Sequence, residues 1–182
     1  MIQLSDQLQP DAKEAVRQLQ SLLKTVGMVS GDISSNNHKI AGELGISTKD
    51  VFAEQTPEQK LQQLQGRRGT TIMVGNGYND SLALAGADIG VAVVGANQQA
   101  HEAADVSLRV TGLRPLVAAL KLSKQAMLKI RWAFAFAVTF NLCGLTAAAL
   151  GYMHPVVAAI LMPLSSLTVL CLSVIWTKSA QN

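Results

Sequence analysis

Three short segments carry side chains that could bind and transfer a phosphoryl group: Ser30-Gly31-Asp32, Lys60, and the glycine-rich run Gly75–Asp80. A serine hydroxyl and a lysine ammonium can hold the oxygens of a phosphoryl group and neutralise its charge. In the glycine-rich run, amide and carboxylate oxygens are ligands of the kind that Mg2+ prefers, and the glycines let the backbone approach a phosphate closely. Together these residue types predict phosphoryl-transfer chemistry.

Each segment, taken singly, also has an ordinary explanation. Ser30-Gly31-Asp32 is typical of a turn with a helix cap, Lys60 of a solvated helix residue, and Gly75–Asp80 of a turn. The order of the three segments and the elements around them therefore decide between the two interpretations.

The elements that would position these segments alternate between short apolar strands and helices. Thr56 predicts an N-cap with Pro57 in the first helical turn, and Gly45 predicts the end of an earlier helix. Such alternation predicts an α/β fold, a parallel sheet with helices on both faces, with its chemistry in loops at the carboxyl ends of the strands. We expect strands at 28–29, 51–53, 70–74 and 89–93, and helices at 11–25, 34–44, 57–64 and 80–85.

The composition is not that of a single soluble domain. Charged residues make up 15% and hydrophobic residues 49% of the 182 residues, against a usual charged fraction of about 25%. No Lys, Arg, Asp or Glu occurs from Trp132 to Trp176, a run too long for one membrane-spanning helix and suited to two. We therefore expect a soluble domain followed by a transmembrane hairpin, with helices at 132–153 and 155–176.

The net charge of +3 does not indicate nucleic-acid binding, because the basic excess lies beside the apolar run. Basic residues at both flanks place both ends of the hairpin in the cytoplasm under the positive-inside rule. These residues are Lys121, Lys124, Lys129, Arg131 and Lys178. The two cysteines, Cys143 and Cys171, lie inside the run without CxxC spacing, so we expect them to pack as small hydrophobic residues.

Polar and sulfur-containing side chains inside the run mark a candidate metal path. Asn141 lies in the first expected span, and Met162 and Ser166 in the second are four residues apart and share a helix face. Pro163 between them could bend the helix and free a carbonyl, and a soft thioether suits Cu(I) better than a hard cation. From spacing alone the simpler explanation is preferred, in which Met162 fills space and the hydroxyls bond backbone or neighbouring helices.

In their order and spacing the three soluble segments resemble the phosphorylation domain of P-type ATPases, a haloacid-dehalogenase-like (Rossmann-like) fold. Members carry Thr-Gly-Asp, then Pro-x-x-Lys, then Gly-Asp-Gly-x-Asn-Asp, and the segments 82–92 and 102–106 are also similar to that family. The resemblance implies Mg2+ and ATP as cofactors. It assigns the phosphoryl site to Ser30, Gly31, Asp32, Lys60 and Asn79, and the Mg2+ site to Asn76 and Asp80.

The membrane run resembles the copper(I)-type heavy-metal (type IB) branch of the family. Phe140-Asn141 is similar to Tyr-Asn of the next-to-last span, and Met162-Pro163-Leu164-Ser165-Ser166 to Met-x-x-Ser-Ser of the last. The second motif looks closest to the branch that supplies copper to cbb-type cytochrome oxidases. This resemblance implies Cu(I) export through a path that includes Asn141, Met162 and Ser166. It also implies a bacterial inner membrane location, and membrane lipid, the remaining helices and domains of the pump and a copper chaperone as partners.

The chain departs from the family pattern in ways that bear on activity. Asn76 stands where the family has an Mg2+-binding Asp, and Phe140 replaces Tyr. The 182 residues contain no Asp-Lys-Thr-Gly-Thr motif and no Cys-Pro-Cys motif, and no separate nucleotide-binding domain is recognised. We expect a missing central strand, unpaired strand edges, and no ATP hydrolysis by this chain alone. The expected organisation is a partial phosphorylation domain at 1–112, a basic linker helix at 113–131, the hairpin at 132–176 and a cytoplasmic tail at 177–182.

Two other function classes compete with a pump segment. A non-catalytic, degenerate remnant with a regulatory or assembly role is favoured by Asn76 and the absent motif. A soluble phosphatase of the same superfamily is disfavoured, because Asp6 and Asp11 lack the apolar strand that would present an aspartate nucleophile.

Overall fold

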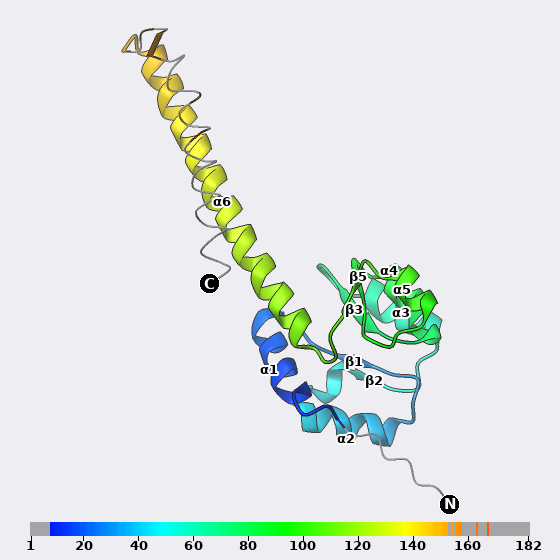
Figure 1. Cartoon of the computed structure of the whole chain (residues 1–182). Helices are drawn as coiled ribbons and strands as arrows, with labels where there is room; N and C mark the ends of the chain where they lie inside the picture. Colours follow the sequence, from blue (N-terminus) through cyan, green and yellow to red (C-terminus); the bar gives the residue numbers. More distant parts are fainter. Residues whose placement is uncertain (1–7, 153, 155, 158–162, 164–166, 168–182) are drawn as a thin grey trace, which may run out of the picture. The chain divides into compact units, whose positions relative to one another are not determined.

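The computed structural model describes residues 8–152, 154, 156–157, 163 and 167 (Figure 1). The chain divides into two compact units, Met1–Leu120 and Lys121–Asn182. The first unit holds all the strands of the described residues, and the second consists of most of one long helix and the residues after it.

Five short parallel strands form two sheets in the first unit (Figure 1). One sheet pairs β1 (Met28–Val29) with β2 (Val51–Phe52). The other has the order β3-β4-β5, formed by β3 (Ile72–Gly75), β4 (Ile89–Ala92) and β5 (Val106–Ser107). The predicted parallel pairing is therefore present, but it is divided between two sheets rather than continuous.

Helices cover both faces of the three-stranded sheet, as the alternation predicts. Met73 of β3 packs on one face with Ala83 and Leu84 of α4 (Ser81–Gly86) and with Ala100. On the other face Val91 of β4 joins the main core. Successive strand residues point to opposite faces, so each four-residue strand supplies side chains to both layers.

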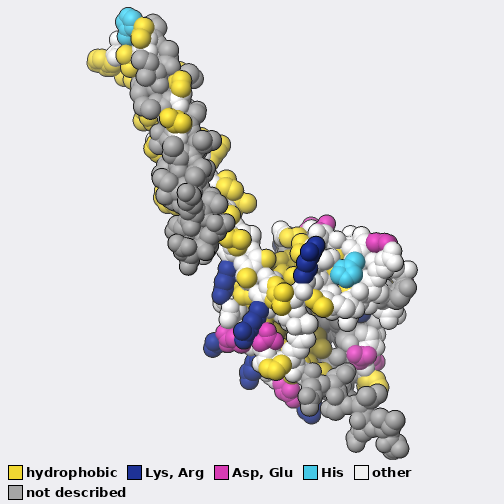
Figure 2. All heavy atoms as spheres, in the orientation of Figure 1, with side chains coloured by type: hydrophobic (Ala, Val, Ile, Leu, Met, Phe, Trp, Pro, Cys, Tyr) yellow, Lys and Arg dark blue, Asp and Glu magenta, His cyan; other side chains and the backbone are white. Residues whose placement is uncertain are grey.

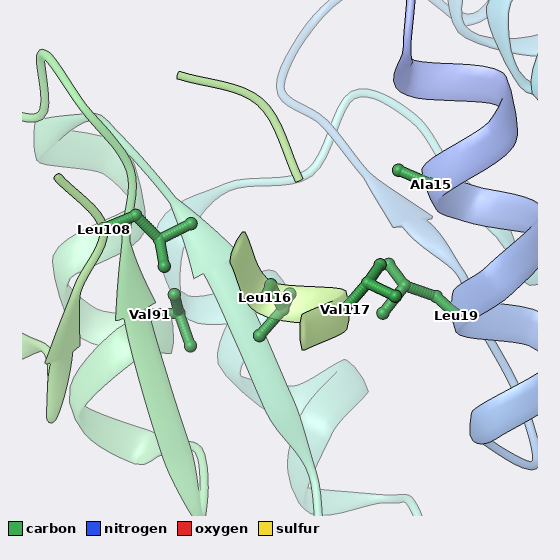
Figure 3. Packing of buried hydrophobic residues seen from close by; sticks show 6 residues of the cluster. All are labelled: Ala15, Leu19, Val91, Leu108, Leu116 and Val117. Atoms are coloured by element: carbon green, nitrogen blue, oxygen red, sulfur yellow. The ribbon is translucent and has the colours of Figure 1, made fainter. Parts of the chain in front are cut away.

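The main core joins the sheet to the first and last helices of the unit (Figure 3). Ala15 and Leu19 come from α1 (Ala12–Leu22), and Leu116 and Val117 from the first turns of α6 (Arg114–Ala149). Val117 meets Leu19, and Leu116 lies beside Val91 and Leu108. Residues a hundred positions apart therefore share one apolar cluster, which fixes the start of α6 to the first unit.

Two predicted helix ends have the capping chemistry that the sequence indicates. The helix α2 (Ser34–Leu44) ends at Gly45 with φ +74°, a conformation that favours glycine. The helix α3 (Pro57–Gln65) begins with a capping box, in which Thr56 and Gln59 satisfy each other's backbone N–H groups. Local side-chain chemistry is enough to set these boundaries.

Several elements were not predicted from the sequence. They include α5 (Gln98–Ala103), β5, and two 3-10 helices at Thr48–Asp50 and Tyr78–Asp80. α5 has the sequence Gln-Gln-Ala-His-Glu-Ala and buries Ala100, so it carries no apolar periodicity. It is held by its Asn97 cap and by contact with α4.

The long helix α6 covers both the expected linker and most of the first expected span. It runs without a break over 36 residues, and it is long and apolar enough to cross a membrane. Hydrophobic side chains lie along it in Figure 2. The helix ends at Ala149, short of the expected position 153, and Gly151, with φ +78°, follows its end. The second expected span, at 155–176, lies almost wholly outside the described residues.

Candidate phosphoryl site

A buried ion pair between Lys60 and Asp80 is the centre of the candidate site. Lys60 Nζ lies 2.7 Å from Asp80 Oδ1, and the two side chains are 7% and 16% exposed. Lys60 belongs to the first turns of α3, and Asp80 directly precedes α4. A buried charge needs a partner, so the pairing explains how a lysine can be buried here.

The second oxygen of Asp80 organises the glycine-rich loop after β3. Asp80 Oδ2 accepts hydrogen bonds from the backbone N–H of Asn76 at 3.3 Å and of Gly77 at 3.2 Å. A Cβ at Gly75 would lie 2.7 Å from Asp80 Cβ, closer than carbon atoms can approach. Glycine at 75 therefore allows Asp80 to fold back over the loop and reach Lys60.

Helix α3 is held in place by its start and by its packing on α4. The Thr56 capping box begins the helix one turn before Lys60. A Cβ at Gly86 of α4 would lie 2.1 Å from Leu61 Cδ1, so the two helices approach closely beside Lys60. This close approach is one reason why a residue from α3 reaches the loop after β3.

The Ser30-Gly31-Asp32 segment forms a second cluster, at the carboxyl end of β1. Ser30 Oγ donates a hydrogen bond to Asp32 Oδ2 at 3.1 Å and accepts one from Asp32 N at 3.1 Å. The backbone of Ser30 also pairs with Phe52 and Gln55. Among the described residues, no hydrogen bond or ion pair joins this cluster to Lys60 or Asp80. The structure thus brings Lys60 into contact with the glycine-rich run Gly75–Asp80. The third expected segment, Ser30-Gly31-Asp32, makes its contacts at the end of β1.

The expected Mg2+ ligands do not by themselves fit a Mg2+ site. The charge of Asp80 is neutralised by Lys60, whereas Asn76 is exposed and offers a neutral amide. Within the described part of the chain, no group of three or more His, Cys, Asp or Glu residues could hold a metal ion. Because Mg2+ needs several oxygen ligands, the geometry favours Asp80 as the partner of Lys60. Asn79, the remaining expected site residue of the loop, is exposed.

The candidate metal path is only partly within the described residues. Asn141 is exposed on α6, one residue after Phe140, whose ring lies 6.1 Å from that of Phe136 between centroids. Met162 and Ser166 lie outside the described residues. The predicted grouping of the three therefore stays a prediction.

Two residues that the sequence analysis did not single out contact the Ser30–Asp32 loop. Asn37 of α2 is 2% exposed and donates to the backbone carbonyl of Asp32. Glu54, after β2, donates its backbone N–H to the same carbonyl. Asn37 could have been found from the sequence only after its helix was placed, as an asparagine on the buried face of that helix. Glu54 has no such signal.

At the opposite, amino end of the three-stranded sheet, the pKa of Asp88 is shifted. The backbone N–H and the hydroxyl of Thr71 both donate to the carboxylate of Asp88 and lower its pKa below the ordinary value. Thr71 directly precedes β3 and Asp88 directly precedes β4. The contact therefore links the two strands and is not part of the candidate phosphoryl site.

Comparison with known proteins agrees with this architecture. The profile of haloacid dehalogenase-like hydrolases matches residues 1–88. A 3-deoxy-D-manno-octulosonate 8-phosphate phosphatase from Moraxella catarrhalis shares the fold, with a TM-score of 0.53 over 60% of this chain and 67% of that chain at 21% identity. The structure of a zinc-transporting PIB-type ATPase in an E2.Pi state matches 92% of this chain, with a TM-score of 0.82 and 29% identity.

Among curated proteins, copper-transporting P-type ATPases are similar over nearly the whole chain. A probable copper-importing P-type ATPase A from Enterococcus hirae is 37% identical over 93% of this chain, which spans 24% of that protein. A copper-exporting P-type ATPase from Staphylococcus saprophyticus is 37% identical over 93% of this chain and 21% of its own length. The chain thus spans about a quarter or less of these relatives, and 28% of the zinc-transporting structure. By both sequence and fold, the chain is homologous to one segment of P-type ATPases, among them copper-transporting proteins and a zinc-transporting PIB-type member.

Proposed function

We propose that this chain supplies part of the phosphoryl site and part of the metal path of an ATP-driven Cu(I) pump. The observation that carries the proposal is the buried Lys60–Asp80 pair, which a glycine-rich loop holds at the carboxyl end of a parallel strand. That end of a doubly wound sheet is where ligands bind in such folds.

Each side chain of the site has a role that its surroundings support. Lys60 offers a positive charge to phosphoryl oxygens, and Asp80 fixes the position of its ammonium. Ser30 can turn its hydroxyl from Asp32 to a phosphoryl oxygen, while the backbone N–H of Gly31 adds a second donor. Asp32 holds the Ser30 hydroxyl in the absence of a ligand, and Asn79 offers an exposed amide beside Asp80.

The phosphorylated aspartate of the pump would come from outside these residues. Within the described part of the chain, β1 pairs with β2 and β3 with β4, which leaves one edge of β1 and one of β3 unpaired. These two strands lead into the two halves of the proposed site. A further parallel strand between them would place its carboxyl end beside both Ser30 and Lys60, and the 182 residues contain no Asp-Lys-Thr-Gly-Thr segment. We therefore propose that this chain alone does not hydrolyse ATP, and that ATP and Mg2+ bind with the help of the rest of the pump.

Copper(I) is the proposed cargo, on the strength of the curated relatives and of Asn141, Met162 and Ser166. The relatives differ in their named direction, since one is described as copper-importing and another as copper-exporting. The similar PIB-type structure is described as zinc-transporting. Export is the direction that the resemblance of the membrane motifs favours, with both ends of the hairpin in the cytoplasm.

The proposal can be tested in a chimera in which this chain replaces the matching segment of the Staphylococcus saprophyticus copper-exporting ATPase. We expect copper-stimulated ATP hydrolysis, and its loss to below a tenth in a Lys60→Met variant, because removal of an aligned charge from a transition state costs about 3 kcal/mol or more. Lys39→Met, an exposed lysine on α2, is the matched control. Met162→Leu should reduce stimulation by copper and leave basal hydrolysis unchanged. Equal activity of the Lys60 and Lys39 variants would sink the proposed site.

The alternative, a non-catalytic remnant, is favoured by Asn76. An Asn76→Asp variant of the chimera should bind Mg2+ more tightly and turn over faster, because it restores a negative oxygen ligand. Mg2+ dependence of ATP hydrolysis measures both effects. No hydrolysis in either form, in a correctly folded chimera, would favour the remnant.

A further inference from the structure

The backbone carbonyl of Asp32 is held from two sides. Asn37 Nδ2 donates to it at 2.9 Å, and the backbone N–H of Glu54 donates to it at 3.1 Å. Asn37 Nδ2 also donates to the carbonyl of Ile33 at 3.3 Å. Asn37 is 2% exposed, and a buried amide that lost these bonds would be costly.

The next residue, Ile33, leaves the start of α2 without a side-chain cap. Ile33 occupies the N-cap position, is 72% exposed, and has no hydroxyl, amide or carboxylate with which to cap. Glu54 provides a cap from outside the helix, because its Oε1 accepts a hydrogen bond from the backbone N–H of Ser34 at 3.1 Å. A carboxylate at a helix N-terminus also interacts favourably with the helix dipole.

Glu54 makes these contacts from an unusual backbone conformation. Its φ is +56°, and it is the single non-glycine residue with positive φ among the described residues. Such a conformation costs free energy and persists where surrounding contacts hold it. Here the two contacts, to Asp32 and to Ser34, lie on either side of Ile33.

We infer that Asn37 and Glu54 are positioning residues that fix the Ser30-Gly31-Asp32 loop for binding a phosphoryl group. The inference rests on the proposed function of that loop. The Ser30 hydroxyl accepts the N–H of Asp32, so its position follows that of the Asp32 backbone, which Asn37 and Glu54 hold. Neither residue touches the phosphoryl group, and both act through the loop.

Hydrogen exchange in the 182-residue chain tests the contacts themselves. Asn37→Asp keeps the shape of the side chain and replaces its donor with an acceptor, which should repel the two carbonyls. We expect faster exchange of the Asp32 and Glu54 amides in this variant. Asn36→Asp, at an exposed neighbour on the same helix, is the matched control and should exchange like the unaltered chain. Equal exchange in the two variants would overturn the proposed contacts.

Inhibition of the chimera by orthovanadate, an oxyanion shaped like phosphate, tests the positioning role. Asn37→Asp should raise the half-inhibitory concentration by about ten-fold or more, since small displacements of positioning groups have effects of that size or larger. Acidic pH should restore part of the sensitivity, because a protonated carboxyl donates a hydrogen bond again. Asn36→Asp should show neither effect. If Lys60→Met abolishes copper-stimulated hydrolysis while Asn37→Asp is as sensitive to vanadate as Asn36→Asp, the positioning role is wrong and the proposed function stands. If Lys60→Met hydrolyses ATP as fast as Lys39→Met, the proposed function itself fails.

The role of Glu54 is tested by supplying the missing cap. Glu54→Ala should weaken vanadate inhibition, and Ile33→Asn in the same chain should restore it, because asparagine is a strong N-cap residue. Lack of rescue, with the start of α2 intact by hydrogen exchange, would show that Glu54 does not act through this cap.

Discussion

At the residue scale, Asp80 holds the candidate site together through two oxygens with different partners. One oxygen pairs with the Lys60 ammonium at 2.7 Å, and the other accepts two backbone N–H groups of the glycine-rich loop. The same carboxylate therefore fixes both a catalytic candidate and the loop beside it.

The Lys60–Asp80 pair should show strong coupling in stability. Lys60→Met and Asp80→Asn should each destabilise the chain, and loss of one partner of a buried pair typically costs about 3–5 kcal/mol. The double variant should cost less than the sum of the two, because neither charge is then left unpaired. Denaturant unfolding of the four forms gives the coupling free energy, and additive effects would show that the pair is not a unit.

Gly75 should tolerate no side chain. Gly75→Ala places a Cβ 2.7 Å from Asp80 Cβ, so Asp80 must move away from the loop and from Lys60. We expect lower thermal stability and faster exchange of the Gly77 amide. Gly42→Ala is the control, because no atom lies within 4 Å of a Cβ at that helical position and alanine there should stabilise the chain by about 0.5–1 kcal/mol. A Gly75→Ala variant as stable as Gly42→Ala would contradict the geometry.

At the scale of elements, short contacts between neighbours keep the small sheets in register. The β3–β4 pair is four residues long and is fastened at its amino end by Thr71 and Asp88. At its carboxyl end it leads into the glycine-rich loop. A contact at one end of the sheet can therefore support the site at the other.

This fastening contact should make stability depend on pH. The folded-state pKa of Asp88 is lowered by hydrogen bonds from Thr71, so its stabilisation is present above the unfolded pKa of about 3.9 and is lost as pH falls through the folded value. Thr71→Val should therefore lower the melting temperature most near neutral pH, with the difference narrowing below about pH 4. Thermal unfolding from pH 3 to 7 measures this, with Thr70→Val as control. A difference independent of pH would show that the hydroxyl does not act through the Asp88 carboxylate.

At the scale of the whole molecule, one helix belongs to two environments. The first turns of α6 bury Leu116 and Val117 in the main core of the first unit, and later turns expose apolar side chains such as Phe134 and Leu142. Exposed apolar surface of this extent is typical of a membrane contact. The relatives are P-type ATPases, and α6 is the candidate membrane helix among the described residues.

Cysteine labelling should locate the membrane boundary on α6. In lipid vesicles, with Cys171→Ser to leave one thiol, Cys143 should resist a water-soluble maleimide and react once the lipid is dissolved in denaturant. Gln125→Cys, in the basic part of the helix, should react in both conditions when Cys143→Ser is also present. Rapid labelling of Cys143 in intact vesicles would contradict membrane insertion of α6.

Features set by neighbouring residues were predictable, whereas features set by distant contacts were not. The bounds of β1 and α2 agree with the sequence expectation, and α3 begins at Pro57 as expected. α1 ends at Leu22, before the expected position 25, because the chain turns there to enter β1. α5 was missed because its stability comes from packing on α4 and not from its own pattern.

The sequence by itself determined a resemblance to P-type ATPases, the alternating α/β elements, three candidate phosphoryl-site segments and an uncharged run suited to a membrane. It could do so because composition, capping and motif spacing are local properties. Only the tertiary structure decided that Lys60 is buried against Asp80, and that Asn37 and Glu54 converge on the Asp32 carbonyl. It also decided that, among the described residues, the pairing is split into two sheets with an open edge on β1 and on β3. These features join residues that are close in space and distant in sequence, and their free energies depend on burial, which no local pattern records.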